Sequence, residues 1–374
     1  FPSQPSNEFL FPPGTPPMLP AGSIGPFVPA WPFMGVQFIP DRPLALVDRV
    51  GNLNVYGGPT SPPKGVNVTA TLQSPKVKPG AAVVTNDDGS TDIFAIDQSG
   101  NLIHHQVNSQ GIYAVNVTQP TGGPTLTGNV SVQRVGSPID PSFIVTGRTV
   151  SGDLAIYAGN DVDGWVTANL SQLAGDPSLQ LPLPVRGRAG VSASSLSVNY
   201  AINGSGHLIE YRPGKRGWLS SDITASARGP VVQGDVSVNL FAGGGARATL
   251  EVFARSTDGH LIRYYRAGKL GWRTEDLSAQ LSGGITAPLN GSIVAVSGAF
   301  GQRFVYAQAG GRIVEFSSDA SGWNAQELSP PTGVGSIIGP LSAPAKGGGA
   351  GRVIFGYSPT GSLVQYSSDG SQWT

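Results

Sequence analysis

The chain has 374 residues, with 23 basic and 23 acidic side chains and no cysteine. This zero net charge argues against a nucleic-acid-binding protein and against attraction to an anionic membrane surface. The lack of cysteine excludes disulfides, thiolate metal sites and cysteine nucleophiles. No run of 18 or more apolar residues occurs, so we expect no helix of this sequence to span a bilayer.

Residues 1–43 form a distinct, proline-rich N-terminal arm that holds twelve of the 32 prolines. Prolines at this density disfavour both helices and central strands. The arm nevertheless carries bulky apolar residues, among them Trp31, Phe33 and Met34, which disordered segments usually lack. Two interpretations stay open: the arm is a strap that buries these side chains against the body, or it is an apolar cap over a ligand or partner.

From about residue 44 the sequence repeats itself. Each repeat contains Gly, any residue, Leu or Ile, two further residues and usually an aromatic side chain. The seven copies begin at Gly51, Gly100, Gly152, Gly206, Gly259, Gly311 and Gly361. In five copies a tryptophan follows: Trp165, Trp218, Trp272, Trp323 and Trp373. Six copies then continue into an Asn/Asp/Glu-x-Ser/Thr segment, for which we expect a short strand that ends in a turn.

Each repeat is predicted to contain four short antiparallel strands. In the sixth repeat they are Ser292–Ser297, Arg303–Gln308, Arg312–Ser317 and Trp323–Leu328, which are rich in β-branched and aromatic residues and separated by Gly-rich turns. No segment has an apolar period of 3.6 over a dozen residues. A four-stranded unit of about 50 residues is typical of a β-propeller blade. The sequence therefore predicts an all-β fold: a seven-bladed β-propeller of four-stranded blades over residues 44–374.

The seventh repeat stops where the other repeats begin their outermost strand, at Trp373 and Thr374. We expect a strand from the N-terminal arm, either Phe9–Phe11 or Gly35–Ile39, to complete this blade and close the ring. Because one blade cannot bury both of its faces, stacking against its neighbours must supply the core.

Residues suited to catalysis or metal binding are few. His104, His105, His207 and His260 are interpreted as polar residues near turns, because histidines at equivalent positions of separate blades cannot converge on one metal. The acidic pair Asp161 and Asp163 is likewise interpreted as part of a turn. No nucleophile elbow, phosphate loop or dinucleotide fingerprint occurs, and only a faint likeness to sialidase Asp-boxes precedes Trp323 and Trp373. We therefore expect no enzyme activity, no cofactor and no metal site.

The Gly-x-Leu/Ile strand followed by Gly-Trp resembles the repeats of lectin-like propellers of the tachylectin and fungal fucose-lectin types. That resemblance covers about residues 44–374 and implies sugar binding between blades by aromatic and arginine side chains. The matching positions are Trp165, Trp218, Trp272, Trp323, Arg212, Arg216, Arg266 and Arg273. Aromatic faces suit pyranose rings and arginine donates several hydrogen bonds. The alternative, that these tryptophans only pack blades together, stays open. Because arginines near tryptophan are confined to the fourth and fifth repeats, we expect one or a few sites.

A second resemblance, carried by the preference for Arg over Lys, the lack of cysteine and the apolar lead-in, is to actinobacterial envelope propellers of the PgfA type. It implies binding of a trehalose mycolate glycolipid, with the arm against the acyl chains, and partnership with a membrane transporter. The sequence begins at Phe1 without a basic leader, so we expect a signal peptide or an anchor to have been removed. The leading hypothesis is a monomeric, extracytoplasmic glycan or glycolipid binder. The alternative is a protein-interaction scaffold in an envelope complex.

Overall fold

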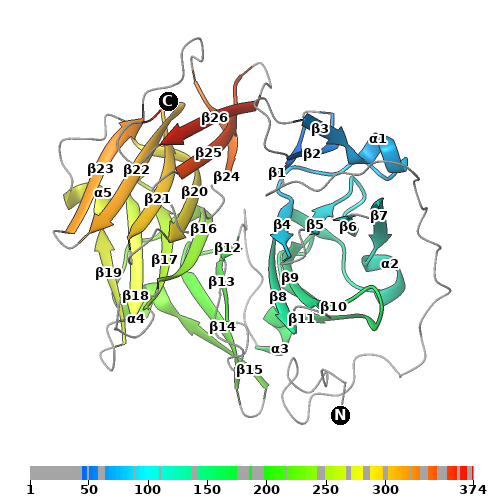
Figure 1. Cartoon of the computed structure of the whole chain (residues 1–374). Coiled ribbons are helices and arrows are strands. Elements are labelled where there is room, and N and C mark those ends of the chain that lie inside the picture. Colours follow the sequence, from blue (N-terminus) through cyan, green and yellow to red (C-terminus); the bar gives the residue numbers. More distant parts are fainter. Residues whose placement is uncertain are drawn as a thin grey trace. The chain divides into compact units, whose positions relative to one another are not determined.

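The computed structural model describes residues 44–48, 50–57, 64–86, 90–108, 111–136, 141–174, 185–187, 198–214, 217–241, 249–266, 271–280, 287–297, 302–319, 322–328, 336–342, 352–359, 363–368 and 373. These residues form an all-β structure of short antiparallel strands with five helices of four or five residues each (Figure 1). In this described part of the chain, no helix has the length and apolar character needed to cross a bilayer.

The chain forms two compact bodies. The first body comprises Phe1–Val185, Ser192–Asn199 and Tyr211–Ser220, and the second comprises Arg186–Val191, Tyr200–Glu210 and Ser221–Thr374. The boundary between them falls within the fourth repeat. Each body is described by itself below.

The first body contains the sheets of the first three repeats. The first sheet has the order β1 (Leu44–Val47), β2 (Leu53–Gly57) and β3 (Lys64–Asn67). The second has the order β4 (Ala82–Thr85), β5 (Thr91–Ile96), β6 (Leu102–Asn108) and β7 (Gly111–Asn116). The third consists of β8 (Leu126–Gly136), β9 (Pro141–Thr149), β10 (Leu154–Asn160) and β11 (Gly164–Asn169).

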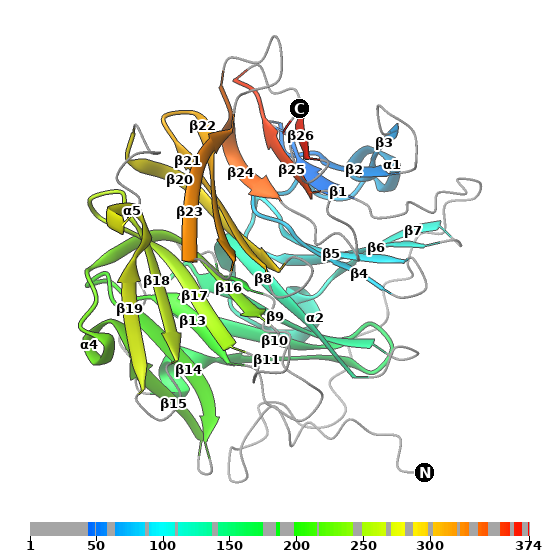
Figure 2. The same cartoon turned by 60° about the vertical axis from the view of Figure 1, so that its left-hand side comes forward.

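The fourth repeat forms a sheet in the order β13 (Asn199–Ile202), β14 (Leu208–Gly214) and β15 (Gly217–Asp222). The fifth sheet comprises β12 (Val185–Gly187), β16 (Val232–Phe241), β17 (Thr249–Ser256), β18 (Leu261–Arg266) and β19 (Trp272–Asp276). The sixth comprises β20 (Leu289–Ser297), β21 (Arg303–Ala309), β22 (Arg312–Asp319) and β23 (Gly322–Leu328). The seventh comprises β24 (Ile338–Ser342), β25 (Arg352–Tyr357) and β26 (Leu363–Ser368), and Figure 2 shows it beside the sixth.

The four strands predicted for the sixth repeat are confirmed within a few residues. The expectation of four strands in every repeat is not met among the described residues, because the first, fourth and seventh sheets have three strands each. In the first sheet the absent position is the strand before β1, which would fall in the arm. In the seventh, Trp373 forms an isolated bridge with Ser368, where an outermost strand would begin. The proposed donor strands, Phe9–Phe11 and Gly35–Ile39, lie outside the described residues, as do the other residues of the arm.

The Ser/Thr segments that were expected to be turns are single helical turns. These are α1 (Val68–Leu72), α2 (Thr118–Thr121), α3 (Leu170–Leu173), α4 (Ile223–Ala227) and α5 (Leu277–Gln280). The preceding Asn or Asp side chain accepts a backbone N–H of the first turn, as Asn169 does from Gln172 and Asp222 from Ala225. Four or five residues are too few for the apolar period of a helix, so only the capping residue was visible in the sequence.

The Ser or Thr of each segment fixes the helical turn to the Gly-x-Leu strand of its own repeat. Its hydroxyl accepts the backbone N–H of the motif leucine at 2.8 to 2.9 Å; the pairs are Leu53 with Thr69, Leu102 with Thr118, Leu154 with Ser171, Leu208 with Thr224 and Leu261 with Ser278. The recurrent Asn-x-Ser/Thr triplets are therefore explained by capping and by this bond.

The glycine of the motif links each repeat to the next. Gly100 has φ +92°, and a Cβ atom there would come within 2.9 Å of Thr125 and 3.0 Å of the Leu126 carbonyl oxygen. Its own carbonyl accepts the N–H of Leu126, at the start of β8, at 2.7 Å. Positive φ and this close approach both require glycine. The same bond recurs at Gly51, Gly206, Gly259 and Gly311.

Apolar side chains between consecutive sheets form the core of each body. In the first body, Leu53 and Val68 pack with Ile93 of the second sheet, and Phe94 packs with Val145 and Tyr157 of the third. In the second body, similar clusters join the fifth sheet to the sixth and the sixth to the seventh. Burial thus comes from stacked sheets, as expected for repeats of this kind.

Replacing Ser171 with Ala is expected to lower the free energy of unfolding by about 1 to 3 kcal/mol, because the buried Leu154 N–H loses its acceptor. Urea unfolding followed by circular dichroism measures this change. Val162→Ala, at an 84% exposed position, serves as the control and should change stability by less than about 0.5 kcal/mol. An equal effect of the two substitutions would contradict this role of Ser171.

Candidate functional site between sheets

Four tryptophans make the same contact with the preceding sheet. Each indole packs edge-on against an aromatic ring of that sheet, with centroids 5.8 to 6.0 Å apart; the pairs are Trp165 with Phe94, Trp272 with Tyr200, Trp323 with Phe253 and Trp373 with Tyr306. In the sequence each partner ring directly precedes an alanine, a signal that was missed. This geometry supports the blade-packing interpretation for all four indoles, so the polar groups beside them decide which place can bind a ligand.

Between the fourth and fifth repeats, in the second body, the polar groups are Glu210 and Arg266. Arg266 Nη2 donates to both Glu210 carboxylate oxygens at 2.8 and 3.0 Å, and the Tyr200 hydroxyl donates to Oε1 at 3.0 Å. The guanidinium carbon lies 5.1 Å from the centroid of the Trp272 ring, in cation–π range. The sequence identified Arg266 and Trp272 but missed Tyr200 and Glu210.

The burial of this group is uneven. The Glu210 side chain is 2% exposed, whereas that of Arg266 is 49% exposed. Burial and the negative charge of Glu210 raise the pKa of Tyr200, so its hydroxyl stays protonated and donates to the carboxylate. The Trp272 indole N–H is buried and has no hydrogen-bond partner in the described part of the chain. The site therefore presents a guanidinium whose charge is balanced by Glu210, beside an indole whose N–H is not bonded to any described residue.

The equivalent place between the fifth and sixth repeats is filled by the chain's own charges. Arg263 donates to Glu251 and to Glu275, and Arg303 Nη1 lies 3.4 Å from the same Glu251. Burial alone would lower the pKa of Arg263, but the hydrogen bonds and charges of the two carboxylates outweigh it and raise the pKa. The guanidinium also lies 4.2 Å from the centroid of the Tyr265 ring. We interpret this network as a structural connection.

Between the sixth and seventh repeats, Arg352 Nη1 lies 3.3 Å from Glu315 and its guanidinium carbon lies 4.3 Å from the Phe304 ring centroid. Burial raises the pKa of Glu315 even though Arg352 and Gln326 oppose the shift. Arg352 is 19% exposed, so this group is less accessible than the one at Arg266.

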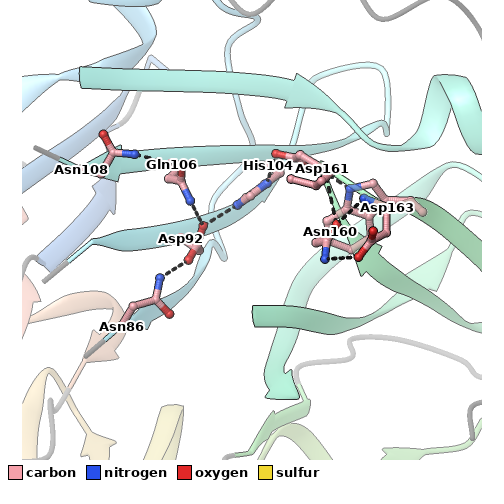
Figure 3. Close-up of polar contacts among 10 residues, drawn as sticks. Asn86, Asp92, His104, Gln106, Asn108, Asn160, Asp161 and Asp163 are labelled. Atoms are coloured by element: carbon pink, nitrogen blue, oxygen red, sulfur yellow. Dashed lines mark hydrogen bonds and ion pairs between the residues drawn. The ribbon is translucent and has the colours of Figure 1, made fainter. Parts of the chain in front are cut away.

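In the first body, the place between the second and third repeats holds a histidine. Figure 3 shows the His104 ring between two carboxylates: Nε2 lies 2.8 Å from Asp92 and Nδ1 lies 2.7 Å from Asp161. The ring stacks on Phe94 at 4.4 Å, and the Trp165 indole donates to Asp161 at 2.8 Å. The interpretation of His104 as a residue near a turn was therefore wrong, because His104 lies on β6 and is 3% exposed. The turn predicted at Asp161 is confirmed, and from this turn between β10 and β11 the Asp161 carboxylate reaches His104.

His104 is a buried cation. Burial alone would lower its pKa, but the hydrogen bonds and charges of Asp161 and Asp92 outweigh burial and raise the pKa to about 9. An imidazole ring whose two nitrogens each face a carboxylate carries a proton on both nitrogens. In this contact the cation is buried between two carboxylates, whereas in the Glu210–Arg266 pair the cation is half-exposed and the carboxylate is buried.

The stability that His104 supplies is expected to be fully present below pH 6.5 and to be lost as the pH rises through about 9, because the folded pKa lies above the unfolded one. From pH 6.5 to 9 the loss is about 2 to 3 kcal/mol. Urea unfolding across this range measures it. His104→Gln, which cannot titrate, should flatten the slope, and an unchanged slope would contradict the assignment.

The other predicted site residues are dispersed. Trp218 is 5% exposed, and its indole N–H has no hydrogen-bond partner among the described residues; Arg212 and Arg273 are exposed. Arg216, Trp31, Phe33 and Met34 lie outside the described residues. His207 and His260 pair with Asp222 and Asp276 at 2.6 and 2.7 Å, and no cluster of three possible metal ligands occurs in the part of the chain that the structure describes.

Comparisons with known proteins support the fold. No family model and no curated protein matches the chain. The chain is structurally similar to fungal fucose-specific lectins: that of Aleuria aurantia superposes with a TM-score of 0.55 at 15% identity, over 79% of this chain and 93% of the lectin. AofleA from Arthrobotrys oligospora gives 0.52 at 16% identity, over 79% and 84%. The Aleuria aurantia lectin is described as a six-bladed β-propeller with a novel mode of fucose recognition.

A catalytic protein shares the likeness as well. An ancestral enzyme of the GH74 class superposes with a TM-score of 0.56 at 11% identity, over 87% of this chain but only 48% of the enzyme. Identities this low establish the fold alone. The chain is an all-β propeller structurally similar to fungal lectins and to a GH74 enzyme.

Proposed function

We propose that this chain is a non-catalytic, lectin-like propeller that binds a saccharide beside Glu210, Arg266 and Trp272. One observation carries the proposal: a half-exposed guanidinium is fixed by a buried carboxylate beside an indole whose buried N–H has no partner among the described residues. Among the four similar places between sheets, this one has the most exposed cation.

The chemistry of the group suits a hydroxylated ring. The N–H groups of Arg266 that do not bond to Glu210 are half-exposed donors for sugar hydroxyls, and the buried indole N–H of Trp272 is a further donor beside them. An indole face packs well against the C–H face of a pyranose. Because Tyr200 and Glu210 already hold the guanidinium, little side-chain entropy is lost on binding, which favours affinity.

The proposal also includes the number of blades in the propeller. We infer seven blades, because the described residues form seven sheets and the sequence holds seven motifs. The lectin of six blades matches 79% of this chain, which corresponds to about six repeats of about 50 residues.

We further propose that the protein is monomeric and acts outside the cytoplasm. A trehalose mycolate-type glycolipid, held with the arm residues Trp31, Phe33 and Met34, and a transporter partner remain hypotheses that rest on sequence composition.

A glycan and glycolipid array tests the proposal. The purified chain is expected to bind a subset of saccharides, Arg266→Ala to lose that binding, and Arg312→Ala, at a 60% exposed arginine of the neighbouring repeat, to retain it. If Trp31→Ala loses binding and Arg266→Ala keeps it, the saccharide binds at the N-terminal arm and not beside Arg266. No binding to any array component would favour the scaffold alternative.

A glycosidase is the second candidate, favoured by the likeness to the GH74 enzyme. Hydrolysis requires two carboxyl groups that flank the bound glycosidic bond. Incubation of the chain with the array ligands and assay of new reducing ends distinguishes the two candidates. We expect no release, and release that is lost in Glu210→Gln would overturn the non-catalytic assignment.

A further inference from the structure

His105 departs from its repeat. It occupies the final position of the Gly-x-Leu motif, where the third, fourth and fifth repeats have Tyr157, Tyr211 and Tyr264. The hydroxyl of Tyr157 reaches back to the preceding repeat, where it donates to the Pro124 carbonyl and lies 3.4 Å from Thr118 Oγ1 of α2. An imidazole is shorter than a phenol and ends in nitrogens, so it cannot copy this contact.

His105 faces the first sheet, whereas its neighbour His104 faces the third. Residues directly opposite in antiparallel strands share a face, and His105 lies opposite Ile93 while His104 lies opposite Phe94. Ile93 packs in the cluster with Leu53 and Val68 of the first repeat. Phe94 packs in the cluster with residues of the third sheet.

The surroundings of His105 do not accommodate a charge. The side chain is fully buried, and neither ring nitrogen has a hydrogen-bond partner of good geometry in the described part of the chain. The strands and helix beside it, β1, β2, β7 and α1, contain no acidic or basic residue. Lys64 is the only such residue of β3, and Asp92, the only one of β5, bonds to His104.

These features point to an acid-sensitive contact. We propose that protonation of His105 separates the first sheet from the second, while the His104 ion pairs keep the second sheet attached to the third. Below neutral pH the imidazole gains a charge that only the opened contact can hydrate.

The direction of the effect follows from the titration. Burial, with a further contribution from the positive charge of His104, lowers the pKa of His105 to about 3, and the backbone of Ile93 opposes this only weakly. For a base with a lowered folded pKa, stability is present above the unfolded value of 6.5 and is lost as the pH falls. If the opened form has the ordinary pKa, its population rises about 30-fold between pH 7.5 and pH 5. His104 stays protonated over this range, because its pKa is about 9.

Hydrogen–deuterium exchange of the full chain tests the proposal, with rates corrected for the intrinsic effect of pH. Between pH 7.5 and pH 5, opening measured in peptides of α1 and β2 should rise about 30-fold, whereas peptides of β9 and β10 should show no such rise. His105→Phe, which introduces the residue found at Phe316 of the sixth repeat, should abolish the rise. His105→Tyr is the second variant, and circular dichroism at pH 7.5 verifies that each variant folds.

Two results would overturn the proposal. One is an equal acid-induced rise in peptides of the first and third sheets of the unmodified chain, which requires no variant. The other is a rise in α1 and β2 that persists in a folded His105→Phe chain. Neither result bears on saccharide binding beside Arg266, since that group belongs to the second body.

Discussion

Arg263→Met is expected to lower the free energy of unfolding by about 3 to 5 kcal/mol, because it leaves the fully buried Glu251 carboxylate without its main partner. Arg303, 3.4 Å away, compensates only in part, and Glu275 loses its partner as well. Thermal and urea unfolding of the full chain measure the loss.

Arg312→Met is the matched control. Arg312 forms an ion pair with Glu327 at 3.0 Å in the sixth repeat, but its side chain is 60% exposed. The free energy of unfolding should therefore fall by less than about 1 kcal/mol. Similar losses in the two variants would show that burial does not distinguish these pairs. The double variant Arg263→Met, Glu251→Leu should recover part of the stability, because the fully buried carboxylate is removed together with its main partner.

Arg266→Ala and Trp272→Phe are expected to weaken saccharide affinity by about 30-fold or more, the size of a central contact in a binding site. The phenylalanine keeps an aromatic ring beside Tyr200 but lacks the second ring and the N–H of the indole, so saccharide affinity should fall much more than stability. Calorimetric titration with the saccharide selected on the array measures both variants.

Trp323→Phe is the control for this pair, since Trp323 makes the same edge-on contact with Phe253 in a place filled by Arg263. It should bind as the unmodified chain does. Equal losses in Trp272→Phe and Trp323→Phe would contradict a site at Trp272 and indicate a general effect on packing.

The sequence was sufficient for the four strands of the sixth repeat because that repeat is encoded locally. Alternating β-branched and aromatic residues bounded by Gly-rich turns predicted β20 to β23 within a few residues. The helical turns were missed, since their stability comes from one capping side chain and one hydroxyl bond, such as that of Ser171, and no periodic pattern marks them.

The candidate site was predicted only in part. Arg266 and Trp272 were visible because they lie close together in one repeat, but Tyr200 and Glu210 belong to the preceding repeat and meet them only through stacking of the sheets. For the same reason the sequence did not reveal that His104 and Asp161, which are 57 residues apart, form an ion pair. The ion pairs at a repeat position thus depend on side chains of the adjacent repeat as well as on those of its own strand.

A crystal structure of the chain grown with the saccharide selected on the array tests the central claim most directly. The account predicts a sugar ring against the Trp272 indole, with hydroxyl groups bonded to the Arg266 guanidinium. A sugar bound elsewhere, with this group of side chains left uncovered, would contradict it.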